Sequence, residues 1–115
     1  MDIQVDIKEQ NDTVILSVNE PIIDHSNSAS LKEKLFLEIA DGKNKIILDL
    51  TKVKEMDSSG LGALLFGKRQ ASHSGGNILL VGVQPAVNSM LRIAQLSRVF
   101  DIFEKTDDAI AHFRS

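Results

Sequence analysis

The segment 57–62, with the sequence DSSGLG, holds the residues of this chain with the clearest capacity for chemistry. Asp57 and Ser58 are both suited to cap the start of a helix. A hydroxyl at a helix N-terminus also lies where free backbone N–H groups and the helix dipole favour an anion such as phosphate. The segment therefore predicts either a plain helix cap or a surface that tolerates an anion such as phosphate.

Three glycines in the same predicted helix need a reason beyond capping. Gly60, Gly62 and Gly67 each cost a helix roughly 0.5–1 kcal/mol relative to alanine. One interpretation is that they let the helix lie close to a sheet. The other, which we favour for Gly60 and Gly62, is that they keep the surface low so that the backbone of a partner can approach.

Other kinds of site find little support in the residue types. The chain has no cysteine, which excludes disulfides, thiol nucleophiles and cysteine metal sites, and its three histidines lack ligand spacing. We expect no metal and no cofactor. A serine hydrolase would need a base beside Ser58, and His25 and His73 are candidates only if the fold brings them close. A phosphoacceptor role for Asp49 would need a lysine at the end of a late strand, which residues 78–83 do not provide.

Charge and hydropathy narrow the possible partners. With 13 basic and 16 acidic residues the net charge is −3, and no basic run with interleaved aromatic residues is present, so nucleic acid is not an expected partner. No apolar run approaches the ~18 residues that span a membrane, and the N-terminus lacks the basic and apolar regions of a signal peptide. We expect a cytoplasmic protein that does not enter a membrane.

Hydrophobic periodicity predicts the elements that position the motif, in the order β-β-α-β-α-β-α-β-α. The chain should begin with a hairpin whose second strand ends near Glu20, because Pro21 cannot donate a ladder hydrogen bond, and residues 21–27 should form a loop. The first strand is expected at 3–9, and later strands at 45–50, 78–83 and 99–103. Helices are expected to start at Ser28, at Asp57 or Ser58, at Pro85 and near Thr106.

Alternating helices and strands after a hairpin predict an α/β sandwich with a mostly parallel central sheet and helices packed on it. The continuous apolar run 45–50 is typical of a strand covered on both faces and should lie in the centre. A chain of 115 residues has room for one domain, at 1–115.

The DSSGLG motif, following the apolar strand 46–50, resembles the signature of the anti-sigma factor antagonists of the STAS (sulfate transporter and anti-sigma antagonist) domain family. The resemblance extends over essentially the whole chain, through the opening hairpin, Asp24-His25 before a serine-rich helix start, the turn at Gly75-Gly76, and Pro85 at the start of a helix. The chain departs from the family at Pro21, where relatives commonly have glycine three residues before the aspartate.

The resemblance implies a binding module in a partner-switching pathway. By position, Ser58 is the residue phosphorylated by a cognate anti-sigma factor, a serine kinase that itself binds ATP, so the chain is a phosphoprotein involved in signal transduction and transcription regulation and not an enzyme. A serine phosphatase is a candidate further partner. The docking surface should also include the exposed face of the helix after the motif, with Lys68. The residues that the resemblance assigns to partner binding are Asp24, His25, Ser26, Asp57, Ser59, Gly60, Leu61 and Gly62.

Two related functions use the same architecture. The chain would also suit a scaffold domain of a stress-sensing assembly, or a small subunit associated with a lipid transporter. Scaffold relatives usually carry an additional N-terminal sensor domain, and transporter subunits tend to lack a clean DSSG. We favour the anti-sigma factor antagonist.

Overall fold

The computed structural model describes all residues from 1 to 115 and contains four helices and seven strands. In chain order the elements are β1 (Val5–Gln10), β2 (Thr13–Val18), β3 (Ile22–Ile23), α1 (Ser28–Ala40), β4 (Lys45–Asp49), β5 (Glu55–Met56), α2 (Ser58–His73), β6 (Asn77–Val81), α3 (Pro85–Ile93), β7 (Asp101–Phe103) and α4 (Thr106–Arg114). None of the helices is long and apolar enough to cross a membrane.

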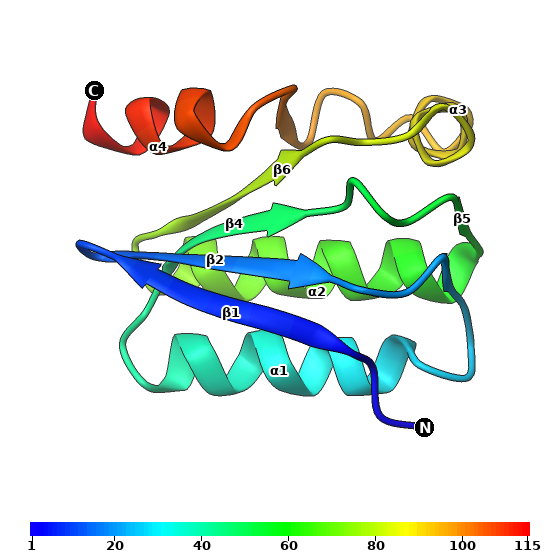
Figure 1. The fold of residues 1–115 in the computed structure, drawn as a ribbon, viewed down its shortest axis with the longest axis horizontal. Coiled ribbons are helices and arrows are strands. Elements are labelled where there is room, and N and C mark those ends of the chain that lie inside the picture. Colours follow the sequence, from blue (N-terminus) through cyan, green and yellow to red (C-terminus); the bar gives the residue numbers. More distant parts are fainter.

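Five of the strands form the central sheet, in the order β1-β2-β4-β6-β7. The hairpin pair β1 and β2 is antiparallel, whereas β2, β4, β6 and β7 run parallel. Helices α1 and α2 lie together along one side of the sheet, and α4 lies on the other side (Figure 1). The predicted α/β sandwich with a mostly parallel sheet and an N-terminal hairpin is therefore confirmed.

The central strand β4 shows why its sequence is apolar throughout. Ile46 and Leu48 point into the large core that the sheet forms with α1 and α2. Ile47 points to the opposite face and packs against Ala109 and Ile110 of α4. Successive side chains of a strand alternate between faces, so a strand covered on both sides is apolar at every position.

The predicted order of elements is confirmed, but the predicted loop at 21–27 is partly wrong. Ile22–Ile23 forms β3 and pairs in parallel with β5 as a separate two-stranded sheet. The carbonyl of Pro21 accepts hydrogen bonds from the backbone N–H groups of Lys54 (2.8 Å) and Glu55 (3.1 Å). Proline lacks only the donor, so its carbonyl is free to begin this pairing. Strands of two residues leave no periodic pattern in a sequence.

The last strand is shorter than predicted. Strand β7 begins at Asp101, whereas the sequence pattern placed its start at residue 99. The backbone N–H of Val99 donates to Leu96 in a turn, and Phe100 is buried in the large core. The apolar character of Phe100 thus reflects packing of the connection from α3 and not ladder pairing, whereas Val99 is exposed.

The small sheet brings two distant segments together at one end of the molecule. Strand β3 leads into residues 24–27 before α1, and β5 leads into Asp57 before α2. A backbone hydrogen bond from Asp57 to the carbonyl of Ile23 (3.1 Å) continues the pairing. In Figure 1 this junction lies at the right-hand side, where β5 meets the start of α2.

Candidate functional site

Asp57, one of the two residues predicted as possible caps, caps helix α2. One of its carboxylate oxygens, Oδ1, accepts hydrogen bonds from the backbone N–H groups of Ser59 (2.9 Å) and Gly60 (3.1 Å). The backbone of Asp57 is extended (φ −97°, ψ −174°), which is the usual conformation of a residue that precedes the first helical turn. The start of α2 is therefore fixed by a side chain that belongs to the motif itself.

The two serines of the motif are in different environments. The hydroxyl of Ser59 donates to Asp57 Oδ1 at 2.5 Å, and its side chain is half-buried. Ser58 is exposed, and its hydroxyl makes no hydrogen bond within the chain. Of the two, only the Ser58 hydroxyl is both exposed and free of hydrogen bonds within the chain.

The segment 24–27 is attached to the same carboxylate. Asp57 Oδ2 accepts a hydrogen bond from the backbone N–H of His25 at 3.2 Å. Within the segment, Asp24 Oδ1 accepts from the backbone N–H (2.9 Å) and the hydroxyl (2.6 Å) of Ser26. The structure thus places Asp24, His25 and Ser26 beside the motif, and Asp57 joins the two segments.

Asn27 is a positioning residue that the sequence pattern did not single out. It is only 3% exposed, and its side chain accepts from the backbone N–H of Asp24 (2.9 Å) and donates to the carbonyl of Ile22 (2.9 Å). A buried polar side chain that satisfies two backbone groups shapes the turn after β3. Asn27 directly precedes α1 but makes no side-chain cap bond to that helix.

The three glycines of α2 divide into two kinds. A Cβ atom on Gly60 would lie 2.3 Å from Met56 Cγ and 3.1 Å from the carbonyl oxygen of Ile23, and one on Gly67 would lie 2.6 Å from Ile78 Cδ1. Close packing therefore accounts for both of these glycines. A Cβ atom on Gly62 would meet nothing within 4 Å, so packing within the chain does not explain Gly62.

Two other predicted contact residues are engaged within the fold. Leu61 is only 7% exposed and belongs to the large core. Lys68 is half-buried, and its ammonium group donates to Asn77 Oδ1 at 2.5 Å, so it does not lie on a free face as the sequence pattern suggested. Within the motif, Ser58 is exposed, whereas Asp57, Ser59 and Gly62 are partly accessible beside it.

Hydrogen bonds hold both carboxylates of the site in their charged form. The Ser59 hydroxyl, followed by the Gly60 N–H, lowers the pKa of Asp57 below its ordinary value. The Ser26 hydroxyl lowers the pKa of Asp24, while repulsion from the nearby Asp57 opposes that effect. Asp57 directly precedes Ser58 and Asp24 lies near Asp57, so the site carries two negative groups near neutral pH, and neither carboxylate forms a salt bridge.

Neither of the two candidate histidines forms a hydrogen bond to Ser58. His73 is the last residue of the 16-residue helix that Ser58 begins, so the two are separated by roughly 22 Å along the axis. His25 contributes its backbone N–H to Asp57, and no hydrogen bond joins its ring to Ser58. Neither histidine ring thus forms the hydrogen bond that would activate Ser58 as a nucleophile.

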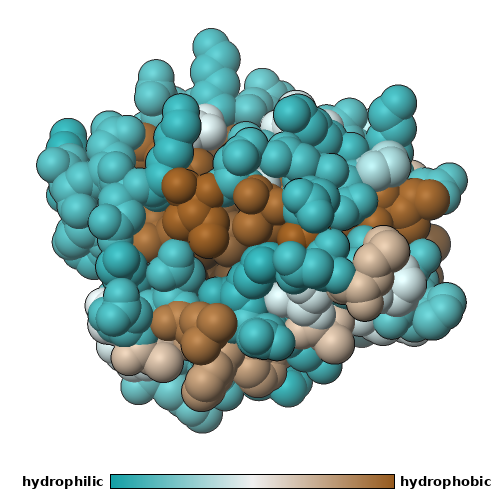
Figure 2. All heavy atoms as spheres, turned by 60° about the horizontal axis from the view of Figure 1, so that its bottom comes forward, coloured by the Kyte–Doolittle hydropathy of each residue, from teal (hydrophilic) through white to brown (hydrophobic).

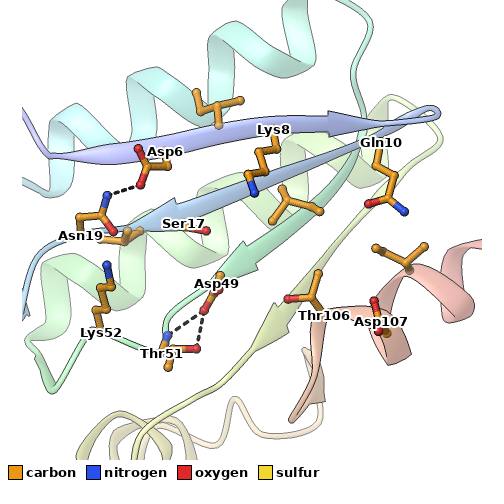
Figure 3. A pocket seen from close by; sticks show the side chains of 14 residues that line it. Asp6, Lys8, Gln10, Ser17, Asn19, Asp49, Thr51, Lys52, Thr106 and Asp107 are labelled. Carbon is orange, nitrogen blue, oxygen red and sulfur yellow. Dashed lines mark hydrogen bonds between the residues drawn. The ribbon is translucent and has the colours of Figure 1, made fainter.

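A hollow of about 690 Å³ lies away from the motif. It is open to solvent on the sheet face beside α4, and Figure 3 shows its polar lining from β1, the end of β4 and the start of α4. Asp49 is at its rim, where its carboxylate accepts from the backbone N–H (2.9 Å) and hydroxyl (2.5 Å) of Thr51 and so stabilises the turn after β4. Neither this hollow nor four smaller ones have Ser58 or residues 24–27 in their lining.

Replacing Asp57 with asparagine is expected to lower stability near neutral pH and to remove part of its pH dependence. The amide nitrogen cannot accept the His25 N–H bond that Asp57 Oδ2 accepts. Because the pKa of Asp57 is lowered on folding, its contribution is complete above the unfolded value of about 3.9 and is lost as the pH falls through the lower folded value. Urea unfolding from pH 7 down to pH 2 should therefore show the gap between wild type and Asp57→Asn closing as the pH falls. Glu104→Gln, at an exposed position, serves as the control, and a constant gap would contradict the assigned role.

A comparison with protein families matches residues 4–109 to the STAS domain. Among known sequences, a candidate anti-sigma factor antagonist of Thermotoga maritima is 31% identical over 105 residues, which cover 90% of this chain and 92% of the relative. The crystal structure of such a protein from the same organism superposes with a TM-score of 0.88 at 28% identity, covering 96% of this chain and 95% of that one.

The anti-sigma factor antagonist SpoIIAA has the same fold. Its unphosphorylated form superposes with a TM-score of 0.75 at 23% identity, with 98% of both chains covered. The Bacillus cell fate determinant SpoIIAA has also been solved in its phosphorylated form, which superposes with a TM-score of 0.73 at 22% identity and covers 96% of this chain and 97% of that one. From the fold, the DSSGLG helix start and these matches together, the chain belongs to the STAS domain family, alongside the anti-sigma factor antagonists that it resembles.

Proposed function

We propose that this chain is an anti-sigma factor antagonist whose binding is switched by phosphorylation of Ser58. Unphosphorylated, it binds an anti-sigma factor through the surface formed by residues 24–27 and the exposed part of the motif, and so displaces the other client of that factor. The observation that carries the proposal is the contrast at the start of α2: Ser58 is exposed with a free hydroxyl, whereas the Ser59 hydroxyl is bound to Asp57.

In this proposal the anti-sigma factor is also the kinase. It binds ATP and magnesium, and a base on the kinase takes the proton of the Ser58 hydroxyl. A bond then forms between Ser58 Oγ and the γ-phosphorus, while the bond from that phosphorus to the bridging oxygen breaks and ADP leaves. This chain is the substrate, and a serine phosphatase restores the hydroxyl by hydrolysis. Because the kinase draws on ATP, the proposal places the chain in the cytoplasm.

The charges at the site suit a switch between a bound, unphosphorylated form and a released, phosphorylated form. The phosphorylated serine would carry about −1.5 to −2 charges at pH 7. The first turn of α2 tolerates an anion, but the new charge lies close to Asp57 and near Asp24, which are already ionised. A partner that accommodates two carboxylates and a hydroxyl meets three anionic groups after phosphorylation. Local charge can therefore release the partner without a rearrangement of the core.

Phosphate transfer from ATP to single-alanine variants tests the assignment. The kinases to use are the anti-sigma factors encoded in the same genome, assayed one at a time with ATP labelled at the γ-phosphate. Ser58→Ala should lose essentially all incorporation, whereas Ser59→Ala should still be modified at position 58, as mapped by peptide mass spectrometry. Incorporation into Ser58→Ala at the wild-type rate, or exclusive labelling of Ser59, would overturn the proposal.

A further inference from the structure

Strand β1 leaves an unpaired edge on the central sheet. It is the first strand of the sheet and pairs only with β2. The backbone N–H of Asn19 donates to the carbonyl of Gln4 (2.8 Å), so Gln4 and Asn19 are a hydrogen-bonded pair next to the pair Val5 and Val18 in the same register. Since hydrogen-bonded pairs alternate in an antiparallel ladder, Asp6 and Lys8 also bond to β2. The N–H and C=O groups of Val5, Ile7 and Glu9 therefore point outward, away from β2.

Helix α1 is attached to this edge at both ends and leaves its middle open. Near one end, Ser30 Oγ accepts from the backbone N–H of Ile3 (3.0 Å) and Lys34 pairs with Asp2 (3.3 Å). Near the other end, Lys43 forms an ion pair with Glu9.

Between these attachments lie two exposed apolar side chains. Ile7 is 44% exposed, and Leu37 is 56% exposed on the same helical stripe as Ser30 and Lys34. Figure 2, which turns the α1 side of the molecule forward, shows hydrophobic atoms gathered in a band among hydrophilic ones. An apolar centre with a charged rim is the usual composition of a protein interface.

We propose that this edge binds a second copy of the chain through antiparallel pairing of the two β1 strands about a two-fold axis at Ile7. In that register the backbone N–H and C=O groups of Ile7 bond to those of Ile7 in the other copy. Val5 then lies opposite Glu9 of the other copy. Asp6 then lies directly opposite Lys8, and the symmetry repeats this pair of opposite charges. The apolar side chains of Ile7 and Leu37 meet their counterparts on the α1 side.

Neighbouring registers fit less well. A two-fold axis between Ile7 and Lys8 would place Asp6 opposite Glu9 and so bring like charges together. That register would also need the backbone N–H and C=O groups of Lys8, which already bond to β2. The strand also lacks the proline with which many edge strands prevent pairing. The self-complementary sequence of β1 thus identifies the occupant of this edge as another copy of the same chain.

Cross-linking in this cysteine-free chain tests the geometry directly. Cα atoms of a hydrogen-bonded antiparallel pair are about 5.5 Å apart, which lies within the range of roughly 4.4–6.8 Å that a disulfide spans. Ile7→Cys should form a covalent dimer under oxidised glutathione. The matched control is Ile102→Cys, an isoleucine in β7 at the opposite edge, whose exposure of 38% is similar. Equal cross-linking of the two variants would overturn the proposal.

A charge-swap series tests the register by sedimentation from micromolar to near-millimolar concentration. Asp6→Lys and Lys8→Asp should each raise the dimer dissociation constant about tenfold or more, because each places two like-charge pairs in the interface. The double variant should return to within a few-fold of wild type. Asp6 also accepts a hydrogen bond from Asn19 (2.7 Å), and the double variant does not restore that bond. Recovery of the dimer in the double variant therefore reports on the pair of charges at positions 6 and 8 across the interface.

Glu104→Lys, at an exposed position beyond β7, controls for net charge. Circular dichroism of every variant confirms that it folds. A wild-type chain that stays monomeric throughout, or a double variant that does not recover, would overturn the proposal. No residue of this interface belongs to the surface around Ser58, so the outcome is independent of the phosphorylation switch.

Discussion

Ser58→Asp is expected to weaken binding of the chain to its anti-sigma factor by about tenfold to several hundredfold. At a separation of about 5 Å and an effective dielectric constant of about 20, each unit of like charge facing a partner carboxylate costs roughly 3 kcal/mol. Screening by salt reduces this value, and about 1.4 kcal/mol corresponds to a tenfold change in affinity. The phosphorylated protein, with nearly twice the charge, should bind more weakly still. Isothermal titration calorimetry at two salt concentrations measures both the loss and its electrostatic part.

Ser72→Asp is the matched control for this measurement. Ser72 is exposed near the opposite end of α2, roughly 21 Å along the axis from Ser58. That distance exceeds the screening length of about 8 Å at physiological ionic strength, so the same added charge should leave the affinity almost unchanged. If Ser58→Asp binds as tightly as wild type, or if both variants lose affinity equally, the Ser58 switch is wrong.

Gly76→Ala is expected to lower the free energy of unfolding by about 2–3 kcal/mol or more. A Cβ atom at this position would lie 2.0 Å from the carbonyl oxygen of Asn44. That oxygen accepts the backbone N–H of Asn77 (2.9 Å) where β4 and β6 begin to pair. Main-chain atoms cannot rotate away as a side chain can, so the segments that lead into β4 and β6 must separate. Urea unfolding should show a lower midpoint with an unchanged slope.

Gly62→Ala controls for the chemistry of the substitution. The added methyl group would meet no atom within 4 Å, and a helical alanine in place of glycine should raise stability by about 0.5–1 kcal/mol. The two variants should therefore change stability in opposite directions. Equal stabilities for Gly76→Ala and wild type would contradict the close approach of Asn44.

Helices of several turns and strands of several alternations were predictable because their apolar side chains recur at a regular spacing. The stripe Leu31, Leu35 and Ile39 is buried in α1 as its helical spacing indicated, and the apolar run of β4 is covered on both faces. Asp57 caps α2 as its residue type suggested. Strands β3 and β5, of two residues each, were missed since so short a pairing depends on a neighbour distant in the sequence.

The sequence by itself determined the α/β architecture, the order of the main elements and the identity of the motif, because these follow from local periodicity and residue type. Only the tertiary structure decided which residues of the motif are available to a partner. Gly60 and Leu61 face inward because β3 and β5 close over the start of α2, and the Ser59 hydroxyl is bound by Asp57. Exposure depends on contacts between segments more than thirty residues apart, such as the bond from His25 to Asp57. Such contacts leave no periodic signal along the chain.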